Sequence, residues 1–137
     1  MSDFNRLHSI TDAMYLKAQQ SLRAILQREA HLRGELRKLD SNAQAARTDQ
    51  TPTIGDMRAI GADLLWEGWL VKTRAQLNLE LARVLVQKEQ NIGRVRKAFG
   101  KKTVSEKLFQ LASNEKAKAA RHRALDQAIG HSLQSKD

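Results

Sequence analysis

Apolar side chains recur at alternating steps of three and four residues in the first third of the chain, and this spacing constrains the fold most. They are Leu22, Ile25, Leu32, Leu36, Leu39, Ala43 and Ala46, with Glu29 as the one interruption. The residues around them, about 4–48, are dominated by Ala, Leu, Arg, Gln, Glu and Lys, which favour helix. Such spacing is typical of the buried face of a coiled-coil helix.

One break interrupts this pattern, because the only proline of the chain, Pro52, lies in the turn-forming segment RTDQTPTIGD. Thr53-Ile54-Gly55-Asp56 then has the form of a capping box, which would begin a second helix over about 56–132. The second helix carries its own apolar series at similar steps: Leu70, Leu77, Leu81, Val84 or Leu85, Ile92, Val95 and Phe99.

Two long helices with one apolar face each, joined by one tight turn at about 49–55, have only each other to pack against. The sequence therefore predicts an all-α protein, a single domain over residues 1–137 that forms an antiparallel coiled-coil hairpin. The second helix is the longer one, so it would overhang at the end where the termini meet. Only 4% of the residues are aromatic, which also favours a thin structure over a round one.

The position of the turn gives an estimate of which residues face each other. If Thr48 lies opposite Gly55, the numbers of opposed residues sum to about 103, and Phe4 lies near Phe99. Residues from about 100 onward would then project past the first helix. A short separate helix over about 56–66 would shift this register by a few turns.

The apolar pattern changes near Gly100. Continuing the earlier spacing predicts apolar residues near 102, 106 and 109, but the stronger apolar positions are Val104, Leu108 and Leu111. We expect a continuous helix with a phase slip or a bend near 100. A helix end at Gly100 is the alternative, with a new helix starting at the possible capping box Thr103–Glu106.

A weaker apolar series continues from there toward the C-terminus. Its members are Val104, Leu108, Leu111, Leu125 and Ile129, and the interruptions are Glu115, Lys118 and His122. This series is too polar for a permanent core and suits a face that docks onto a partner.

Positive charge is concentrated in the same region. Ten Lys or Arg and two acids lie between Arg94 and Arg123, a balance of +8 out of the net charge of +9, and residues 93–102 read GRVRKAFGKK. This segment is a solvated helix face, a binding site for nucleic acid, or a binding site for an acidic protein surface. The candidate partner-binding residues are Arg94, Arg96, Lys97, Lys101, Lys102, Lys107, Leu108, Leu111, Arg121 and Arg123.

Trp66 and Trp69 lie just after the predicted turn, in LLWEGWL. Residues three apart share a helix face, so the two rings are expected to help close that end of the hairpin. Tryptophan is also frequent among interface hot spots, and a two-helix structure has little interior. A second docking patch at Trp66 and Trp69 is therefore a further hypothesis.

The sequence contains no pattern typical of catalysis. There is no cysteine, the four histidines lack metal-ligand spacing, and no Gly-rich phosphate loop occurs. We therefore expect a protein that is not an enzyme and that has no cofactor and no metal. The N-terminus lacks a secretory signal and no apolar stretch is long enough to span a membrane, so a soluble, cytoplasmic protein is expected.

The layout resembles the FliJ/YscO family of type III secretion proteins. Residues 82–128, ARVLVQKEQNIGRVRKAFGKKTVSEKLFQLASNEKAKAARHRALDQA, are similar in texture: a seam interleaved with Arg and Lys, then EKL, then a polar stretch ending in LDQA. The resemblance implies a monomeric stalk protein of a flagellar or related type III export apparatus, peripheral to the membrane. About residues 2–16 and 94–133 would enter the export ATPase ring and promote its assembly and activity.

The same resemblance implies contacts with the export gate protein and with export chaperones. Two other functions stay open from the residues themselves. One is a basic helical protein that binds nucleic acid, and the other is a generic coiled-coil adaptor.

Overall fold

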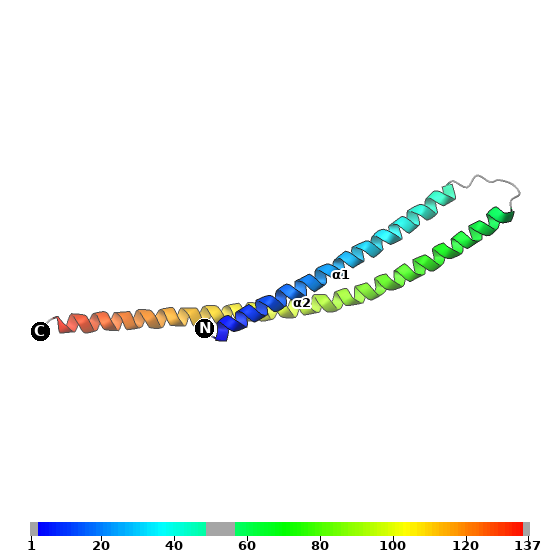
Figure 1. Cartoon of the computed structure of the whole chain (residues 1–137). Coiled ribbons are helices and arrows are strands. Elements are labelled where there is room, and N and C mark those ends of the chain that lie inside the picture. Colours follow the sequence, from blue (N-terminus) through cyan, green and yellow to red (C-terminus); the bar gives the residue numbers. More distant parts are fainter. Residues whose placement is uncertain (1–2, 49–56, 136–137) are drawn as a thin grey trace. The chain divides into compact units, whose positions relative to one another are not determined.

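The computed structural model describes residues 3–48 and 57–135. Two long helices, α1 (Asp3–Thr48) and α2 (Met57–Gln134), pack against each other in antiparallel directions, and α2 is the longer (Figure 1). This confirms the predicted all-α hairpin, and the helix bounds differ from the expected ones by at most two residues. The turn predicted at about 49–55 and the capping box that begins at Thr53 lie outside the described residues.

The two helices contribute to two compact units. The stem unit is residues 19–93, and the terminal unit is residues 1–18 together with 94–137. In the stem unit Leu39 and Ala43 of α1 pack on Leu70 of α2, with Leu77 beside them.

The residues of α1 that are buried or half-buried between the helices, here called the seam of α1, follow the predicted spacing throughout. Leu22, Leu32, Leu39 and the other members of the series are buried or half-buried, and the same steps extend back through Ala18, Tyr15, Thr11 and His8. Because every step is three or four, the residues of α1 that are buried or half-buried in this series lie on one face of the helix within each unit.

Glu29 belongs to the seam rather than interrupting it. Glu29 is buried, and its carboxylate forms ion pairs with Lys88 of α2 and Arg33 of α1. In both pairs the nitrogen lies 3.1 Å from a carboxylate oxygen. The hydrogen bond from Lys88 lowers the pKa of Glu29, against the opposing effect of desolvation. A charged residue at a seam position fixes the register of a coiled coil, because in other registers it loses its partner.

The estimated register was wrong. Observed pairs across the two helices have residue numbers that sum to between 114 and 117, not 103. Phe99 accordingly packs near Tyr15, with ring centroids 5.6 Å apart, and not near Phe4.

The difference between the estimated and the observed register arises at the start of α2. Leu70 is buried against Ala43, whereas residues 59–69 are exposed, so the first turns of α2 precede its packed part. These turns are continuous with the rest of α2, so the shift does not come from a separate short helix.

The seam of α2 also differs in detail from the predicted one. Val84 is buried as expected, but Asn91 and Ala98 are the buried positions where Ile92 and Phe99 were predicted. The same spacing then continues to Lys102 and Ser105, so the contact face shows no phase slip.

The helix runs through Gly100 without interruption. The hydroxyl of Thr103 donates to the carbonyl oxygen of Phe99, four residues earlier, and Ser105 donates to the carbonyl oxygen of Lys102. These are bonds of a helix interior, so the alternative of a helix end at Gly100 with a new cap at Thr103 was wrong.

Candidate docking surfaces

The paired part of the terminal unit is held by polar and aromatic contacts in place of large apolar side chains. The hydroxyls of Thr11 and Ser105 lie 2.6 Å apart, and the Ser105 residue is 1% exposed. The ring of His8 stacks on Phe109 with centroids 5.8 Å apart. Beyond Phe109 on α2 only Ala112 is half-buried among the described residues, so the paired part ends close to these residues.

Lys102 is part of this packing. Its ammonium lies 3.1 Å from the carboxylate of Asp12 and 5.0 Å from the centre of the Tyr15 ring. The hydrogen bond to Asp12 raises the pKa of Lys102 because it favours the charged ammonium group. Lys102 therefore contributes to holding α1 and α2 together, which makes it a poor candidate for binding an external partner.

The other four cations of GRVRKAFGKK are placed differently. They are exposed, and none forms an ion pair with another residue in the described part of the chain: Arg94, Arg96, Lys97 and Lys101. Because α1 pairs with α2 as far as about Phe109, Lys97 and Lys101 flank the coil. The expectation that α2 projects beyond α1 from about residue 100 was wrong by some ten residues.

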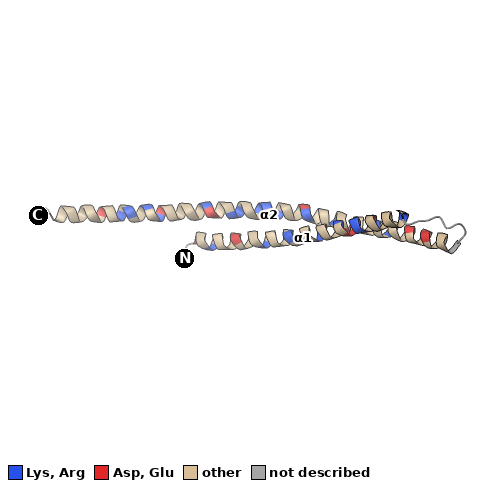
Figure 2. Ribbon diagram, turned by 90° about the horizontal axis from the view of Figure 1, so that it is seen from above, with Lys and Arg blue, Asp and Glu red and all other residues tan. Residues whose placement is uncertain are grey.

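The projecting part of α2 is residues 113–134, here called the overhang, and every residue of it is exposed. Arg121 and Arg123 lie on it, while Lys107 is exposed just before it; Figure 2 shows Lys and Arg in blue along this region of α2. His122 contacts Asp126 of the same helix at 3.1 Å.

The apolar series near Gly100 does not join the seam. Exposed fractions are 58% for Val104, 61% for Leu111, 59% for Leu125 and 50% for Ile129, and only Leu108 is half-buried. These five residues, here called the stripe, are offset from the seam by one residue, which corresponds to about 100° around the helix. The stripe is therefore a second face of α2 that α1 leaves largely exposed.

A shallow groove joins the stripe to α1. It is lined by Leu7 and Thr11 of α1 and by Lys97, Gly100, Lys101, Val104 and Ser105 of α2. Sequence reasoning missed Leu7, which lies one residue before the seam position His8 and was outside every predicted series. With the observed register, its proximity to Val104 follows directly.

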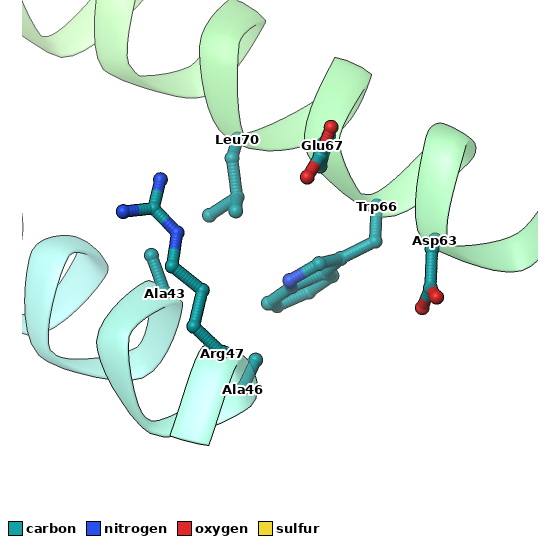
Figure 3. A pocket seen from close by; sticks show the side chains of 7 residues that line it. All are labelled: Ala43, Ala46, Arg47, Asp63, Trp66, Glu67 and Leu70. Atoms are coloured by element: carbon teal, nitrogen blue, oxygen red, sulfur yellow. The ribbon is translucent and has the colours of Figure 1, made fainter. Parts of the chain in front are cut away.

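A second exposed apolar region lies in the stem unit. Trp66 and Trp69 stack with ring centroids 5.1 Å apart, and they remain 40% and 51% exposed. Figure 3 shows the Trp66 ring pointing toward Ala46 and Arg47 of α1, beside Leu70. Trp66 thus lines the end of the packed stem, while Trp69 leaves half of its surface to solvent.

The described residues contain no group of three or more His, Cys, Asp or Glu that could hold a metal ion. Within the same residues, neither helix has a segment apolar enough to cross a membrane.

Comparison with known proteins found no matching family model, no matching curated protein and no matching solved structure. The family resemblance thus rests on the pattern of apolar, basic and polar residues over 82–128 and on the antiparallel two-helix hairpin.

Proposed function

We propose that this protein is a non-enzymatic stalk of a flagellar or related type III export apparatus, similar to the FliJ/YscO family. The observation that carries the proposal is the terminal unit, in which a two-stranded coil gives way to one exposed basic helix. A tapering, positively charged rod of this kind suits a central hole lined by acidic side chains.

In this role the terminal unit enters the ring of the export ATPase. Arg94, Arg96, Lys97 and Lys101 would meet the ring wall, with Arg121 and Arg123 further along the overhang. Complementary charge speeds such an encounter and orients the rod. The stripe would add apolar contacts, and the stem unit, with Trp66 and Trp69, would remain outside the ring for the export gate protein or export chaperones.

ATP hydrolysis by the cognate export ATPase tests the proposal. Adding the purified protein at micromolar concentration should raise the hydrolysis rate and increase the fraction of ATPase in rings. A variant with Arg94, Arg96, Lys97 and Lys101 changed to Glu should lose most of this stimulation. Lys102 is left unchanged in the variant because it pairs with Asp12.

A matched control carries the same number of charge reversals in the stem unit. Arg23, Arg28, Arg37 and Arg83 are exposed and form no ion pair with another described residue, so reversing them gives the same net charge. The control should stimulate like the original protein. Equal loss in both variants would indicate a non-specific charge effect, and no stimulation by the original protein would refute the proposal.

The local charge of +8 between Arg94 and Arg123 favours nucleic acid as the second candidate partner. Its binding would weaken steeply with salt, with a slope set by the number of phosphates contacted. Duplex binding that persists at about 0.15 M salt and is lost in the four-residue variant would support this function over the stalk.

A further inference from the structure

The stripe has the spacing of a coiled-coil seam, but four of its five residues are exposed in the described chain. Val104, Leu108 and Leu111 are followed at the same steps by Glu115, Lys118 and His122, and then by Leu125 and Ile129. Apolar residues thus lie at both ends of this face and polar or charged residues in its middle. A helix that covers the whole face must offer apolar groups at its ends and complementary charge between them.

A second copy of the same helix meets this requirement when it runs antiparallel. If the numbers of opposed residues sum to 233, Leu108 faces Leu125 of the second copy, and Val104 faces Ile129 of the second copy. In the middle, Glu115 faces Lys118 of the second copy. Each of these pairs occurs twice, because the arrangement has twofold symmetry.

Other arrangements of two copies fit less well. A parallel pair in register places Glu115 opposite Glu115 and Lys118 opposite Lys118, and like charges at facing positions are destabilising. Shifting the antiparallel pair by one heptad in either direction places Glu115 opposite a leucine, Leu111 or Leu125. The charges therefore select one orientation and one register.

The residues beside the seam of the proposed dimer are also compatible with this register. Beside the seam, Lys107 would lie next to Ala128 of the second copy, and Asn114 would lie next to Arg121 of the second copy. Each of these pairs contains only one charged residue, so no two like charges face each other. The flanks thus do not oppose the register that the seam selects.

The remaining layer of the seam and the groove also accept a second copy. Leu111 faces His122 of the second copy, and an imidazole ring has an apolar body that can pack on a leucine. Ile129 of the second copy, opposite Val104, would reach the groove at Gly100. A Cβ placed on Gly100 meets no atom within 4 Å, so this part of the groove is open to an incoming side chain.

We propose that the protein forms a reversible antiparallel homodimer through the stripe of α2. Most helical stability in proteins comes from packing of an apolar face, and the dimer supplies the packing that the overhang lacks. The monomer that the family resemblance implies would then be the form present at low protein concentration. This inference goes beyond the proposed function and does not depend on it, but the dimer covers the stripe, so self-association and insertion into a ring compete.

Charge reversals test the pairing directly by sedimentation equilibrium over about 1–500 μM. The original protein should dimerise within this range, and Glu115→Lys or Lys118→Glu alone should weaken dimerisation at least about tenfold, because each affects two symmetric pairs. The double variant, with both reversals, should restore it. Both positions are exposed on the overhang, so the paired part of the hairpin is left intact.

Lys116→Glu is the matched control, since Lys116 is exposed on α2 outside the stripe, and dimerisation should change by less than about twofold. A protein that stays monomeric over the whole range refutes the proposal. Single reversals without effect, or a double variant that fails to dimerise, also refute it.

Cysteine cross-linking tests the orientation, and the absence of native cysteine makes it clean. A mixture of Leu108→Cys and Leu125→Cys proteins should give a disulfide between the two variants under mild oxidation. Either variant alone should give little, because equal positions lie about 17 residues apart along the coil, about 25 Å. Efficient disulfides between two Leu125→Cys copies would indicate a parallel pair and overturn the antiparallel arrangement.

Discussion

A disulfide in place of the buried hydroxyl pair tests the register of the hairpin. Thr11 and Ser105 are 94 positions apart in sequence, and their side-chain oxygens lie 2.6 Å apart. Such closeness is compatible with the Cβ separation of about 3.5–4.5 Å that a disulfide requires. The double variant Thr11→Cys, Ser105→Cys should therefore oxidise readily to an intramolecular disulfide.

The size of the effect follows from the loop that the disulfide closes. Closing a loop of about 100 residues lowers the entropy of the unfolded chain, which stabilises the folded protein by up to about 4.7 kcal/mol. Losing the hydroxyl hydrogen bond costs about 1 kcal/mol. The oxidised protein should thus exceed the original in unfolding free energy by about 3–4 kcal/mol. Urea unfolding followed by circular dichroism, with and without reductant, measures the difference.

The control is Phe4→Cys, Phe99→Cys, a pair that would face each other if opposed numbers summed to 103. In the structure Phe99 packs near Tyr15, and Tyr15 is about 11 residues from Phe4 along α1, about 16 Å. This pair should not form an intramolecular disulfide. Efficient oxidation of the control, together with poor oxidation of the Thr11 and Ser105 pair, would show that the observed register is wrong.

Three further predictions concern the stem unit. Val84→Ala should lower the unfolding free energy by about 2–3 kcal/mol because Val84 is 2% exposed, whereas Val86→Ala, at 58% exposure, should change it by less than about 0.5 kcal/mol in the same urea titration. Since the pKa of Glu29 is lowered in the folded protein, its ion pairs stabilise the fold above the ordinary carboxyl pKa of about 4.3, and this stabilisation is lost as the pH falls. Glu29→Gln should therefore be less stable than the original at pH 7 and nearly equal to it at about pH 2.5, and a difference independent of pH would contradict the ion-pair account. Gly93→Ala should stabilise α2 by about 0.8–1.0 kcal/mol, measured by thermal unfolding, because the added Cβ meets no atom within 4 Å.

The fold could be predicted from the sequence because heptad spacing and a single proline leave few alternatives. Spacing alone assigns Leu32, Leu39 and Ala43 to the seam, and the structure buries all three. The register could not be predicted in this way, because it depends on where α1 and α2 begin to pack and not on where the turn lies. Leu70, rather than the first residues of α2, is buried against Ala43, and the hydrogen-bonded and ion pairs between the helices have sums of 114 to 117 in place of 103.

Polar seam positions were the second source of error. Asn91 and Ser105 are buried although an apolar pattern would pass them over in favour of Ile92 and Val104. Their amide and hydroxyl groups are satisfied by backbone carbonyls and by Thr11, so burial costs little. Most of the apolar side chains that would have fitted the pattern are instead left exposed on the stripe.

The binding role of the basic segment GRVRKAFGKK stays a prediction, and the structure adds where its side chains lie. Four of the five cations in GRVRKAFGKK are exposed as a docking role requires, while Lys102 bonds to Asp12. Sequence alone could not separate Lys102 from Lys101, because only the register decides which of two adjacent lysines faces α1.

Site-specific photo-cross-linking to the export ATPase tests the central claim most directly. A photoreactive residue in place of Leu111, 61% exposed in the terminal unit, should cross-link to the ATPase, whereas one in place of Leu65, 78% exposed in the stem unit, should not. The reaction is carried out with excess ATPase and with nuclease present. Cross-links from position 65 alone, or none from position 111, would contradict insertion of the terminal unit into the ring.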